Sequence, residues 1–344
     1  MQKPAISKKY GVVSLGEILL RLSPEGSERI AYSEIFEKRI GGSELNVAAG
    51  VSMLGLPSAI ICALPKNEIG KYAARTLRYA GVGDEYISYD SSPEARLGIY
   101  YAERGAYPRQ TAVVYDRAAT SFDRFSADSV PAEAFSQANI FHTGGITLAK
   151  TESTRAAAKI LMEKFKAAGA LISFDVNYRA TLWSEDEARA ALYEILPLVD
   201  ILFVSDETLR RMLRRTGTLE SIQASLSKEF PSLSLIASTK RRAISPRLHN
   251  FSSLIYSARD KTYHEEPPYM NIEVVDRIGS GDAFVAGALY ALLKFGSPSE
   301  AVRYGNAMAA LKNTTLGDMP ECDVTDVLRT VRVHSESNPG EMIR

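Results

Sequence analysis

The sequence predicts an α/β protein with a doubly wound, mostly parallel sheet, helices on both faces of that sheet and a small β-sheet lid. From about residue 140 to 238, short apolar segments alternate with longer helical ones, a pattern typical of βαβ units in a parallel sheet. Residues 18–40 and 95–117 instead have strand-like patterns without a helical period, which predicts strands outside the main sheet. The 344 residues suffice for a substantial core.

The first third of the chain is predicted to contribute to the main sheet and to hold the lid. The run at 11–16 is short and apolar, as expected of a buried strand. Ser43 suits an N-cap, and Gly55 suits the end of the helix that follows. We expect main-sheet strands at 11–16 and 58–64, helices at 43–55 and 68–80, and lid strands within 18–40, at 96–103 and at 111–117.

The rest of the chain is predicted to complete the sheet and to end in two helices and a tail. Asp282 lies in the first turn of the first helix, and Ser297 and Pro298 suit the start of the second. The folded domain is predicted to span 10–333, and the polar tail 334–344 is expected to be disordered. We expect strands at 140–143, 171–175, 201–204, 234–238, 251–257 and 262–265, and helices at 152–168, 185–196 and within 207–230.

Composition argues against several classes of protein. The 41 lysines and arginines balance the 41 aspartates and glutamates, so no overall basic field points to nucleic acid. No stretch approaches the roughly 18 apolar residues that a membrane helix needs. Cys62 and Cys322 are far apart and the histidines lack ligand spacing, so we assign no disulfide and no metal held by the protein itself. A cytoplasmic protein that acts on small molecules is expected.

The stretch 274–287 joins the end of an apolar strand, a glycine-rich turn and an apolar helix. The glycines leave the backbone free to bend, so the amides of Gly279, Ser280 and Gly281 can face an anion such as a phosphate. A carboxylate would repel that anion, but Asp282 makes sense as a base that takes a proton from an attacking hydroxyl. For this motif alone, a simple complement to the helix dipole explains Asp282 equally well.

A second glycine pair, Gly41 and Gly42, precedes the helix predicted to begin at Ser43. The pair can let a sugar approach the backbone, and Asn46, one helical turn further on, can bond the sugar hydroxyls. A tight turn alone also explains the two glycines.

Polar residues follow the strand at 171–175, at the edge where parallel sheets bind ligands. Arg179 can fork onto a carboxylate or a phosphate, and Asn177 can reach nucleotide phosphates. Arg117 can clamp an acidic substrate from the lid, although either arginine can also be an ordinary surface residue. Tyr100 and Tyr101 point to opposite faces of one strand, so at most one of them faces a ligand.

Two motifs occur in the order found in the PfkB, or ribokinase-like, carbohydrate kinases. Asp276-x-x-Gly279-x-Gly281-Asp282-x-Phe284 resembles the C-terminal signature of that family, and Gly41-Gly42-Ser43-Glu44-Leu45-Asn46-Val47-Ala48 resembles its N-terminal signature. Segments 16–23, 97–105, 114–118, 174–183 and 276–279 are most similar to 2-keto-3-deoxygluconate kinases. The resemblance covers about residues 10–332. It implies a ribokinase-like fold whose lid often joins subunits, so a homo-oligomer is expected.

The resemblance also implies transfer of the γ-phosphoryl group of ATP, with Mg²⁺, to the terminal hydroxyl of an acidic keto-deoxy sugar. A requirement for a monovalent cation such as K⁺ stays open. Asp282 is then the base, assisted by Gly279, Ser280 and Gly281. The implied sugar contacts are Gly41, Gly42, Asn46, Tyr100, Tyr101, Arg117, Arg179 and Asp318, and the implied nucleotide contacts are Asn177, Ser205, Ser238, Lys240, Arg242, Gly279 and Gly281.

Two features depart from many of these relatives. The segment 205–208 reads Ser-Asp-Glu-Thr where many carry an asparagine and a glutamate that contact magnesium waters, and the segment 240–243 has no glycine pair. A kinase of fructose or another ketose, and a sugar-binding sensor without catalysis, therefore stay open as alternatives. A nicotinamide dehydrogenase is disfavoured, because no G-x-G-x-x-G follows the first strand.

Overall fold

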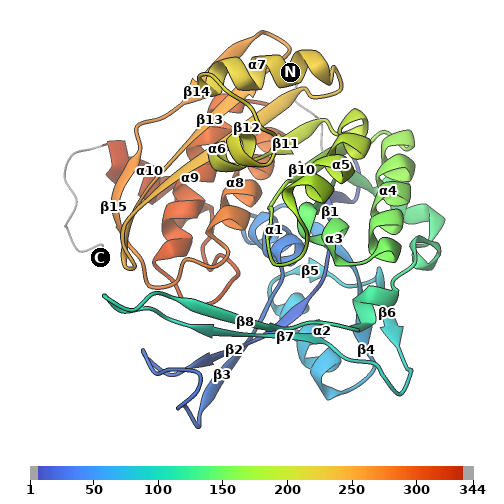
Figure 1. Ribbon diagram of the computed structural model, residues 1–344. Coiled ribbons are helices and arrows are strands. Elements are labelled where there is room, and N and C mark those ends of the chain that lie inside the picture. Colours follow the sequence, from blue (N-terminus) through green and yellow to red (C-terminus); the bar gives the residue numbers. More distant parts are fainter. Residues whose placement is uncertain (1–6, 336–344) are drawn as a thin grey trace.

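The computed structural model describes residues 7–335, and its main body is an 11-stranded sheet with helices on both faces (Figure 1). The strand order is β14-β13-β12-β11-β10-β9-β1-β4-β5, with β15 paired to β13 and β6 paired to β4. The strands are β1 (Tyr10–Leu15), β4 (Ser58–Pro65), β5 (Val82–Gly83), β6 (Ile87–Asp90), β9 (Ala138–Gly144), β10 (Leu171–Asp175), β11 (Ile201–Phe203), β12 (Leu235–Ser245), β13 (Leu248–Ser257), β14 (Thr262–Glu265) and β15 (Tyr269–Glu273).

In that order, the strands from β12 through β5 run parallel to their neighbours. Strand β13 pairs antiparallel with β12, β14 and β15. The fold class predicted from the sequence is therefore confirmed. The helices are α1 (Ser43–Met53), α2 (Glu68–Tyr79), α3 (Gly145–Lys150), α4 (Glu152–Ala167), α5 (Glu185–Ile195), α6 (Asp206–Arg211), α7 (Leu219–Glu229), α8 (Ser280–Phe295), α9 (Pro298–Asn313) and α10 (Val324–Ser335). Short 3₁₀ helices lie at Ser121–Arg124, Ala127–Ser129, Ala132–Gln137 and Leu196–Leu198.

Side chains of the central strands alternate between two cores, as strand geometry requires. One core is shared with α1, α8 and α9 and contains Val12, Ile140 and Phe284. The other is shared with α4, α5 and α7 and contains Val13 and Phe141. Helix α8 is buried along most of its length, which fits its nearly uniform apolar sequence, and it brings its first turn to the carboxyl edge of the parallel strands (Figure 1).

A separate 4-stranded sheet forms the lid (Figure 1). Its order is β3 (Phe36–Gly41), β2 (Leu19–Pro24), β7 (Gly98–Glu103) and β8 (Ala112–Asp116). The prediction of lid strands within 18–40 and 95–117 is confirmed. Strand β8 is exposed along its whole length, so it is a free edge of the lid.

Several local predictions were wrong. Gly42, at φ 143°, is the N-cap of α1 in place of Ser43, which is the first residue inside the helix. Strand β12 continues to Ser245, seven residues beyond the predicted end at Ser238, because its charged second half pairs with β13. The short elements β5, β6, β15 and α3 were not predicted, and neither was α10, a third helix after the two expected at the end of the chain. Ser297 does cap α9, as expected.

The predicted polar tail is tested only at its start. Helix α10 runs to Ser335, so residues 334 and 335 are helical, and the rest of the predicted tail lies outside the described residues. Within residues 7–335, no helix is both long and apolar enough to cross a bilayer.

Close packing of α1 against α8 fixes the two helices whose first turns meet at the site. A Cβ atom on Gly50 would lie 2.6 Å from Ala286 Cβ and 3.0 Å from Pro320 Cγ. We expect Gly50→Val to lower the free energy of unfolding by about 1–3 kcal/mol, because the helices must separate. Ala156→Val, on the exposed face of α4, is the control and reports helix propensity alone. Equal losses in urea unfolding would contradict this packing argument.

Candidate active site

The first turn of α8 is built for an anion. Gly279 adopts the left-handed conformation, at φ 85°, and a Cβ atom there would lie 1.9 Å from the carbonyl oxygen of Asp318. The space around Gly281 is open, with no atom within 4 Å of a built Cβ. The amide of Ser280 donates to the Arg277 carbonyl at 3.3 Å and is therefore engaged in this structure, whereas the amides of Gly279 and Gly281 have no such partner within residues 7–335. Gly279 and Gly281 thus present free N–H groups at a helix N-terminus.

Asp282 is held by three polar residues. Its carboxylate accepts hydrogen bonds from Ser43 Oγ at 2.8 Å and from Asn46 Nδ2 at 2.7 Å. The Ser43 hydroxyl in turn accepts from Asn177 Nδ2 at 2.8 Å. Burial raises the pKa of Asp282, and the bonds from Asn46 and Ser43 and the charge of Arg179 oppose that rise. Asn177, predicted as a nucleotide contact, therefore supports Asp282 through Ser43 in this structure.

Two further buried carboxyl groups lie near Asp282 and were not singled out from the sequence. Burial raises the pKa of Glu44 to about 7, although Thr147 donates to its carboxylate at 2.8 Å. Burial and the charge of Asp282 raise the pKa of Asp175 to about 7. Such a concentration of raised pKa values is typical of a functional site, because unfavourable charge burial persists where chemistry requires it.

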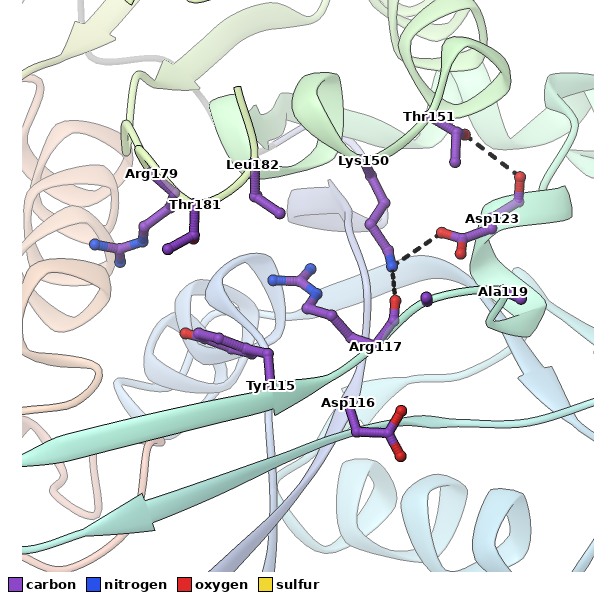
Figure 2. Close-up of a pocket in the computed structure, with 11 residues that line it drawn as sticks. Tyr115, Asp116, Arg117, Ala119, Asp123, Lys150, Thr151, Arg179, Thr181 and Leu182 are labelled. Atoms are coloured by element: carbon purple, nitrogen blue, oxygen red, sulfur yellow. Dashed lines mark hydrogen bonds and ion pairs between the residues drawn. The ribbon is translucent and has the colours of Figure 1, made fainter. Parts of the chain in front are cut away.

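A cavity of about 530 Å³ opens between the end of lid strand β8, the end of α3 and the loop after β10. Figure 2 shows Arg117 and Tyr115 on one side of it, Lys150 on another, and Arg179 with the neighbouring loop facing them. Asp282 does not line this cavity, but Arg179 does, and Arg179 is close enough to lower the pKa of Asp282. The two predicted arginines therefore line one cavity, and Arg179 lies near the predicted base.

Arg117, one residue past β8, is anchored by Glu17. Its Nε donates to Glu17 Oε2 at 3.0 Å, and its Nη2 donates to the same oxygen. The other Glu17 oxygen accepts from Thr120 Oγ1 at 2.8 Å and lies 3.3 Å from Lys150 Nζ, which also pairs with Asp123 at 3.0 Å. Two cations thus face two carboxylates. Nη1 of Arg117 stays available to a ligand, although Glu17 already balances the charge.

Arg179 differs from Arg117 because its charge is not balanced. Its side chain is exposed, and no ion pair involves it within the described part of the chain. An unpaired guanidinium beside a cavity is a suitable partner for a carboxylate or phosphate.

The lid contributes a buried tyrosine to the site. Tyr100 donates through its hydroxyl to Asp318, and its ring lies 5.7 Å from that of Tyr115. Tyr101 points to the other face, where its ring packs against Phe36. The expectation that only one of the two tyrosines faces inward agrees with this geometry.

Asp318 lies against both glycine motifs. A Cβ atom on Gly41 would lie 2.0 Å from its Oδ2, and a Cβ atom on Gly42 would lie 2.3 Å from the Glu17 carbonyl oxygen. The absence of side chains at Gly41 and Gly42 is therefore required by the protein's own atoms, and not only by the approach of a sugar.

The residues predicted to contact the nucleotide do not all face α8. Ser238 is fully buried and accepts a hydrogen bond from Gln223 at 2.9 Å, so its hydroxyl is already engaged. Lys240 and Arg242 share one face of β12, and Arg241 lies on the opposite face, paired with Phe251, whose ring is 5.8 Å from that of Phe284 in α8. Arg241 therefore faces α8.

Ser205 is also engaged. Its side chain caps α6 by accepting from the Thr208 amide at 3.0 Å, and its hydroxyl lies 2.8 Å from Thr208 Oγ1. Glu207 pairs with Arg211 at 2.9 Å. This segment is occupied with stabilising its own helix.

Partial burial and the charges of Arg277 and Arg179 lower the pKa of Arg241. These three arginines thus lie near one another around the free amides of the α8 turn. The positive charge there exceeds what the sequence motifs alone predicted, since Arg241 and Arg277 are brought together only by the fold.

Comparisons with known proteins show which family the sequence resembles. The sequence model described as "pfkB family carbohydrate kinase" matches residues 10–323. The 2-dehydro-3-deoxygalactonokinase of Haloferax volcanii is 35% identical over 322 residues, which cover 93% of this chain and 96% of that protein. Fructokinase-1 of Zea mays is 31% identical, with 90% of this chain and 93% of that protein covered.

A solved structure has the same fold. The crystal structure of 2-dehydro-3-deoxygluconokinase from Thermotoga maritima superimposes with a TM-score of 0.88 at 29% identity and covers 93% of this chain and 99% of that chain.

The hydrogen bond from Ser43 lowers the pKa of Asp282, so its removal should raise that pKa. We expect Ser43→Ala to raise the pKa of Asp282, because the charged carboxylate loses a hydrogen bond that stabilises it. Carboxyl-carbon NMR of aspartate-labelled protein, followed through a pH titration, measures this shift. Ser52→Ala is the control, since Ser52 lies in the same helix and donates to Gly81. An unchanged titration in Ser43→Ala would show that the bond does not stabilise the charged carboxylate.

Proposed function

The chain belongs to the pfkB family of carbohydrate kinases, and from this premise we propose that it transfers the γ-phosphoryl group of ATP to 2-keto-3-deoxygluconate. The observation that carries the proposal is the cavity beside Asp282 that is lined by both Arg117 and Arg179. A neutral sugar has no group that requires two guanidinium groups, whereas the carboxylate of a sugar acid pairs with them well.

In the proposed reaction Asp282 accepts the proton of the terminal sugar hydroxyl as that oxygen attacks the γ-phosphorus of ATP. Its raised pKa makes it a better proton acceptor than an ordinary aspartate, provided that it is ionised. The amides of Gly279 and Gly281 and the helix dipole stabilise the charge on the transferring group. The bond to the β-phosphate oxygen breaks, and ADP leaves.

Mg²⁺ is proposed to arrive with the nucleotide. Groups of three or more metal-ligating side chains were not found within residues 7–335. Mg²⁺ in phosphoryl transfer is commonly held by phosphates, waters and one or two carboxylates. Asp175, at the end of β10 and close to Asp282, is the carboxylate that fits this role. When bound, the ion would neutralise charge on the phosphates.

The sugar is proposed to lie between the lid and α1. Asn46 Oδ1 is buried without a hydrogen-bond partner, so it can accept from a sugar hydroxyl while its Nδ2 holds Asp282. Arg179 and Nη1 of Arg117 are placed for the acid group. Asp318, next to Gly41, is assigned to the hydroxyls at the far end of the sugar.

A kinase of fructose or another neutral ketose is the second candidate, supported by the 31% identity to fructokinase-1 of Zea mays. The relative from Haloferax volcanii, named for the galactonate series, makes the configuration of the acid a separate question. Both questions are answered by comparing substrates.

We expect ADP release, measured with ATP and Mg²⁺, to be fastest with 2-keto-3-deoxygluconate, slower with its galactonate epimer and slowest with fructose. Asp282→Asn should lower kcat by about 10²–10⁴-fold, because the base is lost while the shape is kept. Faster turnover of fructose would show that the substrate is a neutral ketose and not the sugar acid. If none of the three sugars is turned over, the protein acts on a different sugar or binds a sugar without catalysis.

Arg179 is expected to select the acid by its charge. The substrates to compare are 2-keto-3-deoxygluconate and its methyl ester, which differ in the charge of the carboxyl group. We expect Arg179→Met to lower the ratio of kcat/KM values, acid over ester, by about 10-fold or more, because a charged hydrogen bond is lost only with the acid. Arg78→Met, at an exposed pair with Asp84, is the control. Equal losses with acid and ester would contradict a role in recognising the carboxylate.

A further inference from the structure

Arg21 is a lid residue whose charged group is buried in the main domain. Arg21 as a whole residue is only 2% exposed. Its Nη2 lies 2.5 Å from Asp276 Oδ2, its Nη1 donates to Asp318 Oδ1 at 2.8 Å, and its Nε donates to Ser23 at 2.9 Å. One guanidinium from β2 therefore binds two carboxylates that belong to different loops of the main domain.

Each of these carboxylates shapes a part of the site. Asp276 accepts from the backbone amides of Ile278 at 3.1 Å and of Gly317 at 3.2 Å, so it sets the turn that leads into α8. Asp318 accepts from Tyr100 of the lid, and its own carbonyl lies against Gly279. The same cluster thus contacts the lid, the turn of free amides and the carboxylate assigned to the sugar.

The charges in this cluster are balanced only when Arg21 is present. Two buried carboxylates face Arg21 and Lys312, which is 1% exposed. Lys312 donates hydrogen bonds to the backbone carbonyls of Asp276 and Thr315, both at 3.2 Å. Without Arg21 the carboxylates of Asp276 and Asp318 would keep no guanidinium partner, and a buried charge that loses its partner forces its surroundings to rearrange.

We propose that Arg21 is a positioning residue that couples the lid to the phosphoryl-transfer turn, by fixing Asp318 for the sugar and the Gly279–Gly281 amides for the phosphate in one arrangement. The proposal rests on the proposed sugar-kinase function. The planar guanidinium group of Arg21 has several N–H donors and can bind both carboxylates at once, whereas a lysine ammonium cannot reproduce that geometry. Arg21→Lys therefore preserves the charge and removes the fork.

The test uses Arg21→Lys and Arg21→Met, with Arg39→Met as the matched control. Arg39 is the direct cross-strand neighbour of Arg21 in the lid. It pairs with Glu37 at 2.6 Å and Glu321 at 3.6 Å, and its side chain is 30% exposed. It therefore shares the strand position, the charge and the type of partner, but not the burial or the link to the α8 turn.

The first measurement is amide hydrogen exchange of the full chain without ligands, which does not depend on the identity of the sugar. We expect both Arg21 variants to speed exchange of the Ile278 and Gly317 amides by about 10-fold or more, because the acceptor of those amides loses its orientation. Arg39→Met should leave the Ile278 rate unchanged, and the comparison rests on that amide because the Arg39 side chain itself lies against Gly317. Unchanged rates in the Arg21 variants would overturn the proposal, even if the wild-type protein phosphorylates no sugar tested.

The second measurement is steady-state kinetics with the best sugar of the wild-type protein. We expect Arg21→Lys to raise the KM for the sugar and to lower kcat by about 10²-fold, since small displacements of catalytic groups have effects of this size. A loss of folded protein alone would lower kcat and leave KM unchanged. Arg21→Lys with a wild-type KM for the sugar, or with no larger effect than Arg39→Met, would overturn the coupling role.

Discussion

The contact between Gly279 and the carbonyl of Asp318 is the constraint on which the site depends. At this point the turn before α8 and the loop after α9 approach so closely that no side chain fits. The contact places the free amides of the turn next to a carboxylate that also faces the lid. Arg21 then ties that carboxylate and Asp276 to β2. The turn before α8, the carboxylate of Asp318 and the lid are therefore parts of one packed unit, so a displacement of one of them displaces the others.

Carboxyl groups are concentrated at the carboxyl edge of the sheet at an energetic cost. Burial raises the pKa of Glu44, Asp175 and Asp282 together, because none of them is well solvated when charged. For Asp282 the cost is partly offset by donors from α1, which arrive because α1 and α8 begin at the same edge. The same physics that makes this edge unfavourable for folding makes it suitable for a base.

Arg117 and Arg179 were predicted from the sequence to have similar roles, but they differ in whether a carboxylate balances their charge. Glu17 neutralises Arg117 and fixes its direction, with Lys150 and Asp123 completing the group. Arg179 has no such partner within the described residues, so its positive charge is not compensated. Fixed direction and free charge are different contributions to recognition, and in this protein they come from different elements, the lid and the loop after β10.

The order of strands and helices, the lid segments and the glycine motifs with Asp282 could be predicted from the sequence, because hydrophobic period, turn chemistry and helix signals are local. The partners of those residues could not. Arg21 meets Asp318, Glu17 meets Arg117, and Asn177 meets Ser43 only after distant segments fold together. Ser43 was predicted as a cap from local spacing, yet Gly42 caps the helix and Ser43 donates to Asp282. The sequence by itself thus determined the elements and the chemical groups. Only the tertiary structure decided which groups are paired, which are buried and which remain free for a ligand, since burial and pairing depend on contacts between residues far apart in the chain.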